Sequence, residues 1–129
     1  MPDKKTVADI MISDIFTVEE QTPVSDAVHL MAQNNIGAVI VMSPIQDPVG
    51  IFTERDLLKR VVAHDLDPAK TPVSKVMTPK FVCIQNTDDV DDLPAIMVEG
   101  NFRHIPVVDG RKLVGILSIR DVLRFLAGL

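Results

Sequence analysis

The 129-residue sequence contains no tryptophan, no tyrosine and a single cysteine, Cys83. One cysteine cannot form a disulfide within the chain, which is typical of a reducing compartment, so we predict a cytoplasmic location. Aromatic residues make up only 4% of a chain that is 47% hydrophobic, so the core must be built mainly from valine, isoleucine, leucine and methionine. Because Cys83 lies in the apolar stretch FVCIQ, we expect it to be a small buried residue.

Other absences exclude whole classes of protein. Thirteen basic against eighteen acidic residues give a formal charge of −5, and no basic cluster suits a nucleic acid or an anionic membrane surface. The longest apolar run, AVIVM at 38–42, is far below the ~18 residues of a membrane span. The histidines lack metal-ligand spacing, and no local motif activates a nucleophile. We therefore predict a protein that is not an enzyme and has no metal site, nucleic-acid partner or membrane partner.

An internal duplication organises the chain. Two pairs of segments match: VADIMISDIFTV at 7–18 with VSKVMTPKFVCI at 73–84, and TPVSDAVHLMAQNNIGAVIVM at 22–42 with DDVDDLPAIMVEGNFRHIPVV at 88–108. The matches predict two repeats, 7–64 and 73–129, in one module. A linker at 65–72, with two prolines and turn-forming aspartates, joins them.

Each repeat has the pattern of a strand, a helix, two strands and a second helix. In the first repeat, apolar residues fall at helical spacing after Pro23, and Thr22 is expected to cap this helix with Pro23 at its first position. The β-branched run at 38–42 is expected to pair with the next strand in antiparallel fashion. Pro94 falls inside the corresponding helix of the second repeat, so we predict a kinked or shortened helix there.

The same short motif ends the strand pair of each repeat, as GIFTERDLL and, 65 residues later, GILSIRDVL. Ser/Thr-x-x-Asp at the start of a helix is typical of a capping box. In that interpretation Thr53 or Ser118 caps the helix, and Asp56 or Asp121 lies in its first turn, near the positive end of the helix dipole.

The motif also suits a nucleotide. A helix start offers backbone N–H groups to a phosphate, and Arg55 or Arg120 supplies positive charge. An ionised aspartate accepts hydrogen bonds only, which fits a pair of ribose hydroxyls. Gly50 and Gly115 would let the backbone approach closely at such a corner. The residues alone leave capping and ligand binding both open.

These motifs, preceded by IGAVIVM and by RHIPVVDGRKLVG, resemble the cystathionine-β-synthase (CBS) domain, and the tandem arrangement resembles a Bateman module. The resemblance covers residues 7–127. It implies a mixed α/β (α+β) fold of two β-α-β-β-α repeats that pack through their sheets about a pseudo-twofold axis. It also implies a homodimer, which agrees with the high aliphatic content of so small a chain.

The resemblance implies a function as well. Such pairs are similar in binding adenosyl compounds between their repeats: AMP, ADP, ATP, S-adenosylmethionine or NAD, with or without Mg²⁺. The chain is then expected to be a regulatory module, such as an energy sensor, with no required cofactor, and to signal in trans to an effector protein. The alternative is a scaffold or interaction module without a small ligand, in which the motifs serve only as helix caps.

The resemblance also assigns two sets of candidate ligand residues. The first cleft would use Thr53, Arg55 and Asp56 with Thr78, Phe81 and Val82. The second would use Ser118, Arg120 and Asp121, with a wall for the base from Ile15, Phe16, Ile36, Gly37 and Ala38. Arg103 and His104 lie on a strand expected to reach either cleft. At the position of Thr78 the first repeat has Ile12, followed by Ser13, so the second cleft is expected to lack one polar contact or to recover it from Ser13.

Overall fold

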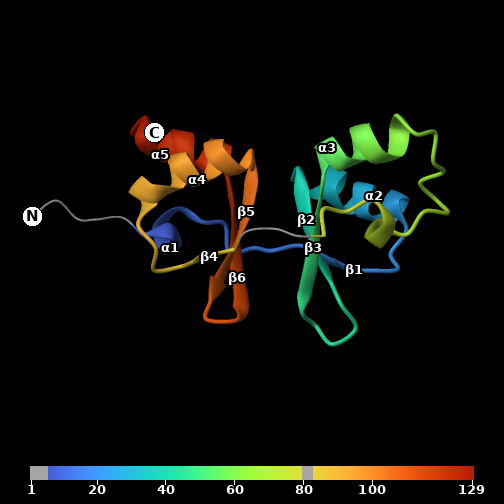
Figure 1. Ribbon diagram of the computed structural model, residues 1–129, viewed down its shortest axis with the longest axis horizontal. Coiled ribbons are helices and arrows are strands. Elements are labelled where there is room, and N and C mark those ends of the chain that lie inside the picture. The colour runs from blue at the N-terminus through green and yellow to red at the C-terminus, as the bar shows by residue number, and fades with distance from the viewer. Residues whose placement is uncertain (1–5, 80–82) are drawn as a thin grey trace, which may run out of the picture. The chain divides into compact units, whose positions relative to one another are not determined.

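A computed structural model describes residues 6–79 and 83–129, and its architecture is mixed α/β (Figure 1). The elements of the first half are α1 (Val7–Ile10), β1 (Thr17–Glu19), α2 (Val24–Asn34), β2 (Ala38–Met42), β3 (Pro48–Thr53), α3 (Glu54–Asp56) and the π-helical η1 (Leu57–Val62). Those of the second half are the 3₁₀ turn η2 (Val73–Lys75), β4 (Ile84–Gln85), the 3₁₀ turn η3 (Val90–Asp92), α4 (Leu93–Gly100), β5 (His104–Asp109), β6 (Lys112–Ser118) and α5 (Ile119–Leu126). The predicted strand–helix–strand–strand–helix order is confirmed in both halves.

The two small sheets have the same topology. β1 pairs with β2 in parallel and β2 with β3 in antiparallel fashion, and β4, β5 and β6 repeat this arrangement. The antiparallel pairing expected for 38–42 is therefore confirmed. Both hairpins have a register shift at the equivalent place, between Val41 and Met42 and between Val107 and Val108, so the duplication preserves even a local irregularity.

The compact units of the structure differ from the sequence repeats. One unit, here called the central unit, comprises residues 16–81, and the other, the terminal unit, comprises residues 1–15 together with 82–129. The opening turn of each repeat therefore folds with the strands and helices of the other repeat.

Backbone hydrogen bonds anchor these exchanged turns. In the central unit the Val73 N–H donates to the Thr22 carbonyl at 2.8 Å, and in the terminal unit the Val7 N–H donates to the Asp88 carbonyl at 2.9 Å. Val73 and Val7 are both fully buried. Each opening turn thus contributes an apolar side chain to the core of the unit that it joins.

Each unit has its own, mainly aliphatic, core. The buried cluster of the central unit consists of Val24, Ala27, Met31, Val39, Val41, Phe52, Val61, Val73 and Val76. That of the terminal unit consists of Val7, Ile84, Val90, Leu93, Met97, Ile105, Val107, Leu117 and Val122. The composition of the sequence is therefore reflected in both cores.

Two local features differ from expectation. The predicted cap at Thr22 is wrong by one position, because α2 begins at Val24 with Pro23 as its N-cap. The freed N–H groups of this helix start are satisfied by the 65–72 segment instead, since the Val24 N–H donates to the Thr71 carbonyl at 2.9 Å.

The expected burial of Cys83 is also wrong, because this side chain is exposed. Ile84, the first residue of β4, takes the buried position here, and Cys83, which precedes the strand, is left outside the core. Partial burial by neighbouring residues still raises the pKa of the Cys83 thiol.

The shortened helix predicted at Pro94 is confirmed. α4 has 8 residues where α2 has 11, and Pro94 lies in its first turn. A proline there does not remove a helical hydrogen bond, because the first N–H groups of a helix have no partner within it.

Among the described helices, none combines the length and the apolar content needed to cross a membrane.

Candidate functional site

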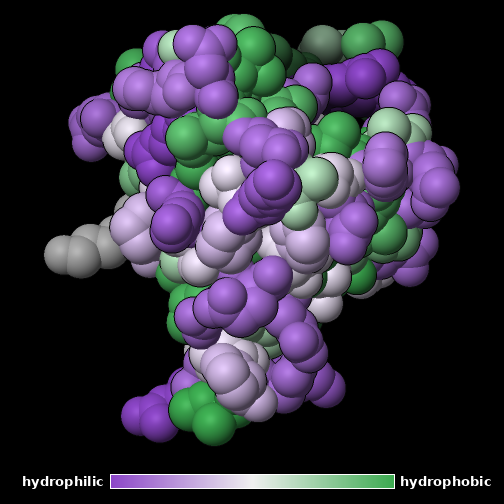
Figure 2. Space-filling model, turned by 90° about the vertical axis from the view of Figure 1, so that its right-hand side faces the viewer, coloured by the Kyte–Doolittle hydropathy of each residue, from purple (hydrophilic) through white to green (hydrophobic). Residues whose placement is uncertain are grey.

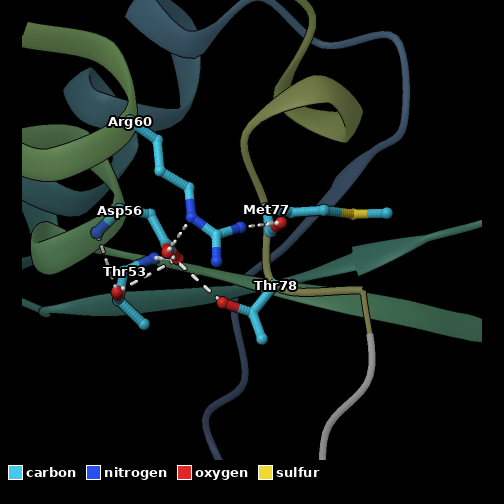
Figure 3. A network of polar contacts seen from close by, with 5 residues as sticks. All are labelled: Thr53, Asp56, Arg60, Met77 and Thr78. Carbon is cyan, nitrogen blue, oxygen red and sulfur yellow. Dashed lines mark hydrogen bonds and ion pairs between the residues drawn. The ribbon is translucent and has the colours of Figure 1, made fainter. Parts of the chain in front are cut away.

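The Thr53 motif forms a capping box where β3 meets α3 in the central unit (Figure 3). The Thr53 N–H and hydroxyl donate to Oδ2 of Asp56 at 3.0 and 3.1 Å, and the Asp56 N–H donates to the Thr53 hydroxyl oxygen at 3.2 Å. Asp56 is only 6% exposed. The capping interpretation of the motif is therefore confirmed here, with a buried carboxylate at its centre.

The second carboxylate oxygen of Asp56 has partners of its own. The Thr78 hydroxyl donates to Oδ1 at 3.3 Å, and Nε of Arg60 lies 3.7 Å from the same oxygen. Arg60 also donates from Nη1 to the Met77 carbonyl at 2.8 Å. Figure 3 shows the guanidinium between the carboxylate and this carbonyl. We call Thr53, Asp56, Arg60, Met77 and Thr78 the Thr53 corner.

A pair of backbone hydrogen bonds brings Thr78 to this corner. The Thr78 N–H donates to the Ile51 carbonyl at 2.8 Å, and the Ile51 N–H donates to the Thr78 carbonyl at 3.0 Å. Next to Ile51, a Cβ atom on Gly50 would lie only 2.9 Å from the Thr78 carbonyl oxygen. The close approach that Gly50 allows is therefore to the Thr78 backbone of the same chain, whereas an approach to a ligand stays a prediction.

The Ser118 motif forms the same box where β6 meets α5 in the terminal unit. The Ser118 N–H and hydroxyl donate to Oδ2 of Asp121 at 3.1 and 2.8 Å, and the Asp121 N–H donates back at 3.2 Å. Ile12 takes the place of Thr78, because it exchanges two backbone hydrogen bonds of 2.9 Å with Ile116. A Cβ on Gly115 would lie 3.0 Å from the Ile12 carbonyl oxygen, so both motif glycines serve close packing.

The Ser118 corner (Ile12, Ser118, Asp121 and Phe125) lacks the further polar contacts of the Thr53 corner. Phe125, at the position of Arg60, packs against the core of the terminal unit. Ile12 has no hydroxyl, and no hydrogen bond from Ser13 replaces it among the residues described. Asp121 is half-buried, and in the described part of the chain its Oδ1 accepts no hydrogen bond.

Other predicted ligand residues lie beside the two boxes. In the central unit Ala38 pairs with Thr53, and the Gly37 carbonyl accepts the Glu54 N–H at 3.0 Å. In the terminal unit His104 pairs with Ser118, and the Arg103 carbonyl accepts the Ile119 N–H at 2.8 Å. Gly37 and Arg103, like Ala38 and His104, thus occupy equivalent positions.

The remaining predicted residues are less constrained. Arg55 and Arg120 are exposed, and neither forms an ion pair within residues 6–79 and 83–129. Half-buried Phe16 and Ile36 belong to the central unit, and half-buried Ile15 belongs to the terminal unit. Whether these three, with Gly37 and Ala38, form a wall for a ligand base next to Asp121 stays a prediction. Phe81 and Val82 lie outside the described residues.

Sequence reasoning missed Arg60. Its spacing of four residues after Asp56 places the two on neighbouring turns of a helix, and this spacing favours an ion pair, so a signal was present. Its bond to the Met77 carbonyl spans 17 residues of sequence, which no local pattern indicates.

No cluster of three or more histidine, cysteine, aspartate or glutamate side chains suited to a metal ion occurs in the part of the chain described here.

Curated relatives match most of the chain. An uncharacterised 17.7 kDa protein of Acidianus ambivalens is 34% identical over 121 residues, which are 93% of this chain and 72% of that protein. CBSCBSPB2, a CBS domain-containing protein of Arabidopsis thaliana, is 34% identical over 120 residues, and the chain spans only 22% of its length.

Solved structures match the whole fold. A protein with CBS domains from Burkholderia ambifaria MC40-6 has a TM-score of 0.91 and 36% identity, with 96% of this chain and 95% of that chain covered. The CBS domain pair of protein MJ0100, solved with 5′-methylthioadenosine and S-adenosylmethionine, has a TM-score of 0.88 and 25% identity, with 98% of each chain covered. The family model of the CBS domain matches residues 7–63 and 73–128. The chain therefore belongs to the CBS domain family and carries two CBS domains in tandem.

Proposed function

We propose that this CBS pair binds an adenosyl ligand and, without catalysing a reaction itself, regulates another protein in trans. Two findings support the proposal: the duplicated capping box with its carboxylate, and the related CBS pair solved with 5′-methylthioadenosine and S-adenosylmethionine. Both of those compounds contain adenosine, whose ribose has two neighbouring hydroxyls. An ionised carboxylate is a suitable acceptor for such hydroxyls.

The state of Asp121 carries the proposal. Its Oδ2 is used by the capping box, while Oδ1 accepts no hydrogen bond in the described part of the chain and the residue is half-buried rather than buried. A ribose hydroxyl can therefore bond to Oδ1 without breaking the helix cap. Hydrogen bonds to a charged acceptor are roughly twice as strong as those between neutral groups.

Positive charge near this corner suits those adenosyl ligands that carry phosphate. Arg120 lies in the first turn of α5, and Arg103 bonds through its carbonyl to the first residue of that helix. Both side chains are exposed and unpaired among the described residues. AMP, ADP, ATP and NAD would gain from these cations, whereas S-adenosylmethionine, itself a cation, would bind through its adenosine.

A homodimer is part of the proposal. α5 exposes three apolar side chains at helical spacing: Ile119, Leu123 and Leu126, which are 37%, 58% and 52% exposed. A second copy that covers such a stripe removes apolar surface from water. In the central unit, η1 exposes a comparable pair one turn apart, Leu58 and Val62, at 62% and 57%. The face seen in Figure 2 shows hydrophilic residues among hydrophobic ones. Light scattering of the purified chain should give twice the monomer mass.

A thermal-shift panel tests the ligand. The purified chain is heated with 5′-methylthioadenosine, S-adenosylmethionine, AMP, ADP, ATP and NAD, each with Mg²⁺ and with EDTA, and with GTP as the control. A ligand at ~100 times its dissociation constant adds about 2.7 kcal/mol of stability, and this should raise the melting temperature by several degrees. No shift with any adenosyl compound at millimolar concentration would contradict the proposal.

A scaffold without a small ligand is the second candidate. It is favoured by one observation: both boxes are complete as helix caps in the chain alone. Under this alternative, Asp121→Ala should lower the folding stability by only about 1 kcal/mol, the usual loss at a cap. Every adenosyl compound should leave the melting temperature unchanged, both in the wild type and in Asp121→Ala.

A further inference from the structure

We infer that Arg60 is a positioning residue that holds the Met77–Thr78 backbone next to Asp56. Because Arg60 and Thr78 both contact the Asp56 carboxylate, a ligand that binds at the Thr53 corner must first displace contacts within the chain, whereas a ligand at the Ser118 corner need not. The part of this inference that concerns ligand rests on the proposed function. The part that concerns the backbone does not, and it can be tested without any ligand.

The geometry of Arg60 supports a positioning role. Its Nη1 donates to the Met77 carbonyl at 2.8 Å, a good distance for a charge-assisted hydrogen bond. Its Nε lies 3.7 Å from the Asp56 carboxylate, and the Arg60 side chain is 47% exposed. An ion pair of that length and exposure contributes little by itself. The bond to the carbonyl is therefore the stronger of the two, and the carboxylate mainly orients the guanidinium.

The same carboxylate oxygen is already in use. Oδ1 of Asp56 accepts the Thr78 hydroxyl at 3.3 Å and faces Arg60, and the residue is 6% exposed. A ribose hydroxyl that bonds to this oxygen must displace one or both of these neighbours. In the Ser118 corner the equivalent positions hold Ile12 and Phe125, whose side chains have no polar group, so binding at Asp121 breaks no such contact.

The Met77–Thr78 segment, which Arg60 holds, lies close to the point where the sequence passes from one unit to the other. Met77 and Thr78 stand just before the place where the sequence leaves the central unit, at 81–82. Ile12 stands just before the other crossing, at 15–16, and its hydrogen bonds to the described residues are the two backbone bonds to Ile116. A ligand at Asp56 therefore acts on a polar tie to the connecting backbone, whereas a ligand at Asp121 does not. A ligand shifts a conformation only through such differential contacts.

Hydrogen exchange without ligand tests the positioning role. The reporter is the Thr78 amide, which bonds to the Ile51 carbonyl. Arg60→Ala should speed its exchange about tenfold, through easier local opening. Arg60→Lys keeps the positive charge but lacks the planar guanidinium that can contact the carboxylate and the carbonyl together, so it should give an intermediate rate. The amides of β2 should not change.

Lys59→Ala is the matched control, because Lys59 is the exposed neighbour of Arg60 on η1 and has no partner among the described residues. It should leave the Thr78 amide at the wild-type rate. An unchanged Thr78 rate in Arg60→Ala, or an equal acceleration across β2, would overturn the positioning role.

Calorimetry with 5′-methylthioadenosine tests the ligand part. The measurements use an Asp121→Ala background, so that only the Thr53 corner can bind. This compound has no phosphate, so Arg60 has no anion to contact. Arg60→Ala should then tighten binding about two- to fivefold, because the ligand no longer displaces the guanidinium, and Lys59→Ala should have no effect.

Weaker binding in Arg60→Ala would show that Arg60 is a direct ligand contact, and it would overturn the ligand part of the inference. If wild type and every variant fail to bind this or any other adenosyl compound, the proposed function fails. The exchange rate of the Thr78 amide then still decides the role of Arg60.

Discussion

The Thr53 and Ser118 corners share one capping box and differ in what surrounds its carboxylate. In both, a hydroxyl and an N–H from the last strand residue bond to Oδ2 of the aspartate. Thr78 and Arg60 contact Oδ1 of Asp56, whereas the equivalent positions of the other corner hold Ile12 and Phe125. Both repeats therefore retain the cap, which stabilises the helix start, but the surroundings of the second carboxylate oxygen, Oδ1, differ between them.

The difference arises at two structural levels. The cap is local, because Ser/Thr-x-x-Asp places its partners three residues apart. The second oxygen depends on a residue one helical turn later and on the opening turn of the other repeat, 22 residues away along the sequence in the case of Thr78. Changes at these two positions can alter one corner without disturbing the fold of either unit.

Removal of the carboxylates should have the largest effect on this comparison. Asp56→Ala takes away the cap, leaves the Thr78 hydroxyl without its acceptor and removes the ion pair of Arg60, so it should cost about 3 kcal/mol of folding stability. Asp121→Ala removes a cap only and should cost about 1 kcal/mol. Urea unfolding monitored by circular dichroism measures both. Equal losses would show that the contacts to Oδ1 of Asp56 contribute nothing.

The motif glycines should show where the corners are alike. A methyl group on Gly50 would meet the Thr78 carbonyl oxygen at 2.9 Å, and one on Gly115 would meet the Ile12 carbonyl oxygen at 3.0 Å. Gly50→Ala and Gly115→Ala should each push the neighbouring backbone away and cost about 2 kcal/mol. A cost below 0.5 kcal/mol in either variant, taken here as roughly the scale of a neutral surface change, would show that its backbone segment moves freely.

Exchange of the two hydroxyl positions should give the smallest and most specific effects. Thr78→Val keeps the shape of the side chain but removes the hydroxyl that donates to Asp56, for a loss of about 1 kcal/mol. Ile12→Thr places a hydroxyl at the position equivalent to Thr78 in the corner of the half-buried Asp121, and it should change stability by less than about 0.5 kcal/mol.

The same pair of variants should act oppositely on ligand. Thr78→Val should strengthen binding of 5′-methylthioadenosine at the Thr53 corner, and Ile12→Thr should weaken it at the Ser118 corner, because each changes the competition for Oδ1. Titration calorimetry measures both. A change in the same direction for the two variants would contradict a role for this competition.

Much of the fold could be predicted from the sequence, because its signals are local or repeated. The duplication, the hairpins, both capping boxes and the short helix at Pro94 follow from spacing and from residue type. The exchange of opening turns between the units could not be predicted, since the bonds of Val7 and Val73 join segments far apart in the chain. The prediction of Thr22 as the cap of α2 was wrong for a similar reason, because the carbonyl of Thr71, and not the Thr22 side chain, accepts the Val24 N–H.

The candidate site divides in the same way. Ser/Thr-x-x-Asp located both carboxylates, and the resemblance placed Thr78 beside Asp56, where the structure has it. Arg60 was missed, because its carbonyl partner Met77 lies in another segment. Cys83 was expected inside because its neighbours are apolar, but the buried position is taken by Ile84, the first residue of β4.

The most direct test is titration calorimetry of 5′-methylthioadenosine into the wild-type chain, Asp56→Ala and Asp121→Ala. If the two corners differ as we propose, the wild type shows a tighter and a weaker site, Asp121→Ala loses the tighter one, and Asp56→Ala retains it. If instead Asp56→Ala abolishes the tighter site and Asp121→Ala retains it, the contacts that surround Asp56 favour ligand binding rather than oppose it, and the account of the two corners is wrong.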